Sequence, residues 1–112
     1  MRLKFLGKST QGGGSPTLYE TDRDTYVVQG WRVSGMPPDV VEIPESLLSH
    51  LLPGTRLEAP LVPTGKRWRG DDGEWGTYTL SGLLVTDFDS LQQMKIPDHE
   101  SCVEVGKRRK ED

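Results

Sequence analysis

Short stretches in which apolar and polar residues alternate run along the chain, separated by turns rich in glycine, proline and acidic residues. Alternation with a period of two predicts β-strands that bury one face. Two further segments carry apolar residues at helical spacing. The strands are expected at residues 2–6, 17–21, 25–33, 40–43 and 56–61, in a hairpin at residues 67–78, and at residues 77–85 and 101–105.

The order of these elements predicts an α+β domain that is rich in β-structure. Most connections are hairpins, and the strand–helix–strand links are too short for a regular parallel crossover. We therefore expect a mainly antiparallel, curved sheet or half-open barrel of about six or seven short strands with two short helices. Residues 1–106 should form a single globular domain, followed by a charged, flexible tail at residues 107–112.

A hairpin arm is the most detailed structural prediction. Gly70-Asp71-Asp72-Gly73 suits a four-residue hairpin loop. A loop centred there places Arg69 opposite Glu74 and Trp68 opposite Trp75. Both are favourable cross-strand pairs, at about 0.2–1 kcal/mol each. Because a lone two-stranded hairpin is only marginally stable in water, the arm should project from the sheet and be more mobile than the sheet.

Local signals also predict one more hairpin turn and the two helices. Asp22-Arg23-Asp24 is a polar turn between β-forming residues. Pro44-Glu45-Ser46 is typical of a helix start, and Pro53-Gly54 ends that segment. Thr86 or Asp87 can cap a second helix, which Pro97 stops. The positions expected to face inward are Leu47, Leu48, Leu51 and Leu52 in the first helix and Phe88, Leu91 and Met94 in the second.

The same periodicity predicts the core. Val27, Trp31 and Val33 share one face of the strand at residues 25–33, which has the clearest strand pattern. The predicted core consists of Leu3, Phe5, Val27, Trp31, Val33, Ile43, Leu47, Leu51, Leu57, Leu80 and Phe88.

Composition narrows the possible partners and the compartment. The formal net charge of −3 argues against nonspecific nucleic-acid binding over the whole surface. Cys102 is the only cysteine, so no internal disulfide is expected. The amino terminus lacks the apolar run of a signal peptide, and no apolar stretch is long enough for a membrane helix. We therefore expect a cytoplasmic protein with no membrane partner.

The glycine-rich segment near the amino terminus invites a phosphate-binding interpretation. Gly7-Lys8-Ser9-Thr10 ends as a phosphate-binding loop does, but that motif needs a further glycine where Arg2 stands, and a helix must follow. Gly12, Gly13, Gly14 and Ser15 can form an anion-binding nest. A flexible loop between strands is the commoner use of such a run.

Histidine and cysteine provide too few groups for a metal site. His99 and Cys102 have the spacing of half a site, and His50 is the one further imidazole. A structural zinc ion takes four protein ligands and a catalytic one takes three. On an extended chain, residues three apart point to opposite faces, so His99 is poorly placed as a base for Cys102. We expect no metal, no cofactor and no catalytic residue, and the chain is more readily interpreted as a non-enzyme.

The arm at Lys66-Arg67-Trp68-Arg69 is the most distinctive exposed segment. Tryptophan and arginine dominate interaction hot spots, so the candidate interaction residues are Trp68, Trp75, Arg67 and Arg69. Basic residues next to an aromatic can also grip a phosphate backbone and stack a base. Asp71, Asp72 and Glu74 offset much of this local charge, which places nucleic acid second to a protein partner.

Four segments together resemble a family of small actinobacterial proteins of the Streptomyces type. They are Lys4-Phe5-Leu6-Gly7, Gly12 to Thr17, Val27 to Trp31, and Val41-Glu42-Ile43-Pro44. The glycine run followed by Ser-Pro-Thr and the Gln-Gly-Trp triplet are the most specific parts, and the resemblance extends to about Val105. Such proteins are often encoded beside helix-turn-helix regulators, and no activity is assigned to them. The resemblance implies a bacterial cytoplasmic accessory protein in a regulatory set.

These observations rank three functions. The first is a non-enzymatic module that binds a protein partner, with a transcription regulator as a candidate partner. The second is a nucleic-acid-binding module that uses residues 66–69. The third is a small ligand-binding protein or enzyme that uses the glycine loop at residues 11–16. A concave apolar pocket with converging polar groups would favour the third function.

Overall fold

A curved antiparallel sheet that is not closed forms most of the molecule, as the sequence predicted. The computed structural model describes residues 1–10, 15–70, 73–94 and 96–110. The elements are β1 (Leu3–Lys8), β2 (Thr17–Thr21), β3 (Thr25–Arg32), β4 (Val40–Pro44), η1 (Glu45–His50), β5 (Thr55–Leu57), β6 (Val62–Gly70), β7 (Gly73–Ser81), β8 (Leu83–Leu84), α1 (Phe88–Met94) and β9 (Glu100–Arg109).

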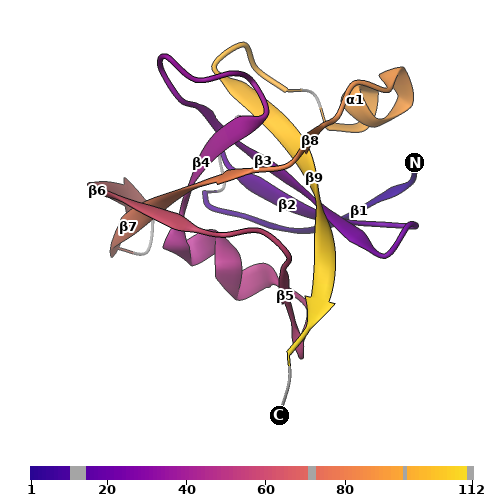
Figure 1. Cartoon of the computed structure of the whole chain (residues 1–112), viewed down its shortest axis with the longest axis horizontal. Helices are drawn as coiled ribbons and strands as arrows, with labels where there is room; N and C mark the ends of the chain where they lie inside the picture. Colours follow the sequence, from indigo (N-terminus) through magenta and orange to yellow (C-terminus); the bar gives the residue numbers. More distant parts are fainter. Residues whose placement is uncertain (11–14, 71–72, 95, 111–112) are drawn as a thin grey trace.

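Strands β3 and β9 organise the sheet (Figure 1). One edge of β3 pairs with β2 and then, at Trp31 and Arg32, with β4. The other edge pairs with β9 from Thr25 to Trp31. Strand β4 continues the sheet to β7 and β6, while β9 also pairs with β8 and β5. In Figure 1 the β6–β7 hairpin extends to the left of the sheet, away from α1 and the amino terminus.

Strand β3 is buried on both of its faces, because each face packs against a separate core. Residues 26–30 are all buried. The main core lies on one face and contains Leu18, Tyr26, Val28, Val41, Ile43, Leu47, Leu57, Leu80, Val103 and Val105. A smaller core on the other face contains Val27, Val85, Met94 and Cys102. Alternation alone predicted one buried face for β3, and this is why Tyr26 and Val28 were missed.

Phe5 and Phe88 were wrongly predicted in the core, and Trp31 and Val33 are half-buried residues that belong to neither core. Phe5 is 56% exposed and Phe88 is 71% exposed. Phe5 lies on the edge strand β1 beside an irregularity in the pairing with β2, and its ring meets only the edge of Tyr19, at 6.2 Å between centroids. Phe88 begins α1, whose buried face is formed by Ser90 and Met94. Val27, Ile43, Leu47, Leu57 and Leu80 are buried as expected.

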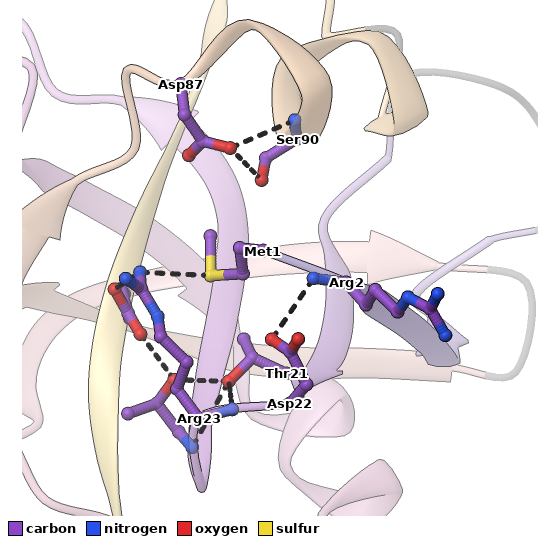
Figure 2. A network of polar contacts seen from close by, with 9 residues as sticks. Met1, Arg2, Thr21, Asp22, Arg23, Asp87 and Ser90 are labelled. Carbon is purple, nitrogen blue, oxygen red and sulfur yellow. Dashed lines mark hydrogen bonds and ion pairs between the residues drawn. The ribbon is translucent and has the colours of Figure 1, made fainter.

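Both helices begin where local signals placed them, but the first ends at His50, so Leu51 and Leu52 follow it and pack on the main core from outside the helix. Residues 45–50 form a 3₁₀-helix with Pro44 as the N-cap residue, and its Leu47 is buried. Asp87 caps α1, because its Oδ2 accepts hydrogen bonds from the Ser90 backbone N–H at 3.2 Å and from the Ser90 hydroxyl (Figure 2). In the described part of the chain, no helix is long and apolar enough to cross a membrane.

The turn at residues 22–24 is tied to the amino terminus, as Figure 2 shows. The Arg2 backbone N–H donates to Asp22 Oδ1 at 3.1 Å. Arg23 donates to Glu104 Oε1 of β9 at 2.6 Å and contacts the Met1 sulfur at 3.2 Å. The predicted turn therefore also links the residues before β1 to β9.

The ends of several strands differ from the expectation: β6 already begins at Val62, and the strand expected at residues 77–85 is divided between β7 and β8. Strand β5 stops at Leu57, although Ala59 and Leu61 still pack on the main core. Strand β9 continues to Arg109, because Lys107 to Arg109 pair with β5. The segment expected as a charged tail thus begins inside a strand. The Lys107 ammonium donates to Glu20 Oε2 at 2.6 Å and lies 5.3 Å from the centroid of the Tyr26 ring.

Candidate functional site

The β6–β7 arm has the predicted register, and it brings one tryptophan against the sheet. Trp68 lies opposite Trp75, and Arg69 lies opposite Glu74. Residues 71 and 72 of the turn lie outside the described residues. The Trp68 ring packs against Trp31 of β3, with 5.5 Å between centroids and 51° between planes. Both rings are half-buried, so the predicted core residue Trp31 belongs to this surface instead.

Glycine makes room for this ring contact. A Cβ atom at Gly70 would lie 2.4 Å from the Trp68 ring. The ring therefore covers Gly70 on its own strand while it meets Trp31 across the sheet. Trp68 is held by the arm and by the sheet together.

A hollow of about 360 Å³ lies beside these rings, and its lining is mixed in charge. It is lined by Trp31, Glu42, Lys66, Arg67, Trp68 and Thr77. Glu42 Oε2 accepts a hydrogen bond from the Thr77 hydroxyl at 2.7 Å. Lys66 Nζ lies 3.9 Å from Glu42 Oε1, and its side chain is 71% exposed. Lys66 is therefore a loosely paired cation at the mouth of the hollow.

Glu74 of the arm forms its ion pair with Arg67 and not with Arg69, which lies directly opposite it. Arg67 Nε lies 3.2 Å from Glu74 Oε1, so Glu74 binds the arginine diagonal to it. Arg69 is exposed at the position facing Glu74. An exposed pair of this kind contributes about 0.2–1 kcal/mol.

The free edge of β6 is poorly suited to accept another strand. The pairing of β6 with β7 is irregular between Pro63 and Arg67. Gly65 within that stretch has φ of 80°, which turns the backbone out of the extended conformation. Proline, bulges and lysine are devices that block strand addition at sheet edges. A partner would meet the side-chain face of the arm more readily than its edge.

The glycine segment contributes little to a site among the described residues. Gly12, Gly13 and Gly14 of the predicted nest lie outside the described residues. Ser15 is buried, and its hydroxyl donates to the Thr10 carbonyl at 3.4 Å. Gly7 lies in β1 under the His50 ring, which a Cβ atom there would meet at 2.2 Å. Close packing therefore explains the glycine of the phosphate-loop-like motif.

Cys102 is unsuited to nucleophilic chemistry. It is 2% exposed, and burial raises the pKa of its thiol to about 12. A thiol with this pKa is almost entirely protonated at neutral pH, and the thiolate is the reactive form. Within residues 1–10, 15–70, 73–94 and 96–110, no group of three or more His, Cys, Asp and Glu side chains is placed to hold a metal ion.

Sequence reasoning missed a buried carboxyl group. The Glu100 side chain is fully buried, opposite Trp31 on β3. Gln29 Nε2 donates to Glu100 Oε1 at 2.7 Å. The second oxygen, Oε2, has no hydrogen-bond partner among the described residues, although His99 Nε2 lies 3.3 Å away. Burial raises the pKa of Glu100 above its usual value, while Gln29 and His99 act in the opposite direction.

Glu100 lines a pocket of about 400 Å³ beside α1, on the face that carries the smaller core. The turn before β9 creates this placement, because the Glu100 backbone N–H donates to the Pro97 carbonyl at 3.0 Å. A single glutamate after His99 in a polar stretch gave no sign of burial. Comparison with protein-family models, curated proteins and solved structures found no match.

Proposed function

We propose that this chain is a non-enzymatic protein-interaction module, and that its docking surface is the hollow between Trp31 and the β6–β7 arm. The observation that carries the proposal is the half-buried Trp31–Trp68 pair beside Lys66 and Arg67. Tryptophan and arginine are enriched in binding hot spots, where a well-packed anchor is surrounded by contacts that exclude water. A partner would insert an apolar or aromatic side chain there and present a carboxylate to Lys66.

Nucleic acid is the weaker candidate for the same surface. Phosphate binding requires a concentration of positive charge, whereas Glu42 lies in the hollow and Glu74 pairs with Arg67. Base stacking requires an open aromatic face, whereas the Trp68 ring packs on Trp31 and covers Gly70. Both observations favour a protein partner.

Regulators are the partners to test first. The family that the chain resembles is often encoded beside helix-turn-helix regulators. Capture from cells that express the chain naturally, with crosslinking and quantitative mass spectrometry, would identify the partner. The comparison uses wild type, Trp68→Ala and, as control, Phe88→Ala, which removes an aromatic side chain that is 71% exposed on α1 and does not line the hollow.

The proposal expects Trp68→Ala to lose the captured protein and Phe88→Ala to keep it, with both variants folded by circular dichroism. Equal capture by a folded Trp68→Ala variant would refute the docking surface. Loss of capture after nuclease treatment would favour the nucleic-acid alternative.

A further inference from the structure

The pocket beside α1 differs from the arm hollow in both shape and chemistry. Apolar side chains form most of its wall, namely Pro38, Leu84, Val85, Leu91, Ile96 and Pro97. Glu100 and Ser101 are the buried polar residues of the lining, and the Ser101 hydroxyl already donates to the Pro38 carbonyl at 2.7 Å. Arg32 and Asp98 are exposed residues of the lining. Small-molecule sites typically combine an apolar wall with few, well-placed polar groups.

The unpartnered oxygen of Glu100 defines what the pocket lacks. A buried polar atom without a partner destabilises the protein, and a charged one does so more strongly. Gln29 satisfies Oε1, whereas Oε2 has no hydrogen-bond partner in the described structure. The Gln29 amide oxygen is a second buried acceptor without one. Gln29 is not among the residues that line the pocket. Oε2 of the ionised Glu100 is an acceptor, so the group that the pocket lacks is a hydrogen-bond donor.

The charged residues around the pocket leave this need unmet. Arg32 directs Nε to the backbone carbonyl of Glu100 at 3.3 Å, not to its carboxyl group. The His99 side chain is 66% exposed, and its Nε2 lies 3.3 Å from Oε2; this contact is an ion pair only when the imidazole is protonated, and it is not aligned as a hydrogen bond. A better-aligned donor that enters the pocket can therefore take this oxygen.

We infer that the pocket binds a small organic cation, with a compact apolar body against the α1 wall and one ammonium or amidinium nitrogen that donates to Glu100 Oε2. A cationic nitrogen matches the site better than a neutral donor, since hydrogen bonds between ionised groups are roughly twice as strong as neutral ones. It also supplies the counter-charge that a buried carboxylate needs. An anionic ligand would face the Glu100 carboxylate, and the cation of the lining, Arg32, already donates to the Glu100 backbone carbonyl.

Benzylammonium, benzyl alcohol and benzoate are suitable probes, because they share a ring and differ in the polar group. We expect benzylammonium to bind most tightly at neutral pH in titrations followed by amide chemical shifts, with the shifts centred on Val85, Leu91 and Ile96. Glu100→Gln keeps the shape of the side chain and removes its charge. It should weaken benzylammonium about tenfold or more and leave benzyl alcohol nearly unchanged.

The inference is independent of the arm, and Trp68→Ala is its control: that variant should bind benzylammonium as wild type does. Unchanged benzylammonium affinity in Glu100→Gln would overturn the inference. Tighter or equal binding of benzoate or benzyl alcohol to the wild-type protein would overturn it as well, and this comparison decides the matter even if Glu100→Gln does not fold.

Discussion

Replacement of Tyr26 by phenylalanine tests whether a buried hydroxyl holds the η1–β5 connection onto the sheet. Tyr26 is fully buried in the main core. Its hydroxyl accepts from the Leu52 backbone N–H at 3.0 Å and bonds to the Thr55 hydroxyl. Thr55 donates its own proton to the Leu52 carbonyl at 2.8 Å. The Tyr26 hydroxyl is therefore the donor to Thr55. The Tyr26 hydroxyl, the Thr55 hydroxyl and the backbone of Leu52 form a closed ring of hydrogen bonds.

Tyr26→Phe removes one oxygen and leaves two groups without their partner. The Leu52 N–H loses its acceptor in a part-buried position, which costs about 1–3 kcal/mol, and the neutral bond to Thr55 contributes about 0.5–1.5 kcal/mol. Overlap between these terms is expected, so we predict a total loss of about 1.5–3 kcal/mol. At about 4 °C per kcal/mol for a domain of this size, the melting temperature should fall by about 6–12 °C.

Urea denaturation followed by tryptophan fluorescence measures the free energy of unfolding, and circular dichroism gives the melting temperature. Tyr78→Phe is the matched control. The Tyr78 side chain is half-buried, and its hydroxyl forms no hydrogen bond with the residues that the structure describes. It should therefore lose less than about 0.5 kcal/mol, as surface changes usually do. Equal losses in the two variants would refute the role of the hydroxyl ring.

Three further predictions concern other parts of the fold. Gly30→Ala places a Cβ atom 2.8 Å from the Glu42 carbonyl oxygen, so β3 and β4 must separate. Urea titration should show that the free energy of unfolding falls by about 1–3 kcal/mol or more. A variant as stable as wild type would contradict the close packing of β3 and β4. Cys102, with a pKa of about 12, should react with iodoacetamide at neutral pH only at the rate of unfolding; rapid labelling of the native protein would contradict its burial. Burial raises the pKa of Glu100, so the native state binds the carboxyl proton more tightly than the unfolded state does. Wild type should therefore lose stability relative to Glu100→Gln as the pH rises above the usual glutamate pKa of 4.5. A pH-independent difference in stability between the two proteins would exclude a raised pKa.

Local chemistry predicted the arm well. Gly70 lies opposite Gly73, as the glycines of the predicted turn require, and Trp68 therefore lies opposite Trp75 as the sequence predicts. The same holds for Asp87, which bonds to Ser90 three residues away. These features depend on residues that are close together in the chain, so the residue types alone predict the local structure.

Features that depend on distant segments were not predictable. Strand β3 is buried on both faces because residues far along the chain pack against each of them: Val103 and Val105 join the main core, and Val85, Met94 and Cys102 join the smaller one. Trp31 becomes part of the arm surface only when β6 folds over it. Glu100 is buried through the long-range pairing of β9 with β3, and a polar residue in a polar stretch carries no signal of this. Sequence periodicity reports how one strand is exposed and leaves open which segments cover it.

The position of β9 has a consequence for synthesis on the ribosome. Residues 100–109 emerge after every other strand, yet they pair with β3, β5 and β8. Until then, one edge of β3, with its Tyr26-Val27-Val28 run, has no partner in the nascent chain. An unpaired, apolar strand edge is a template for association with other chains, and non-local pairing slows folding. A chaperone that shields β3 until β9 arrives would therefore raise the yield of native protein.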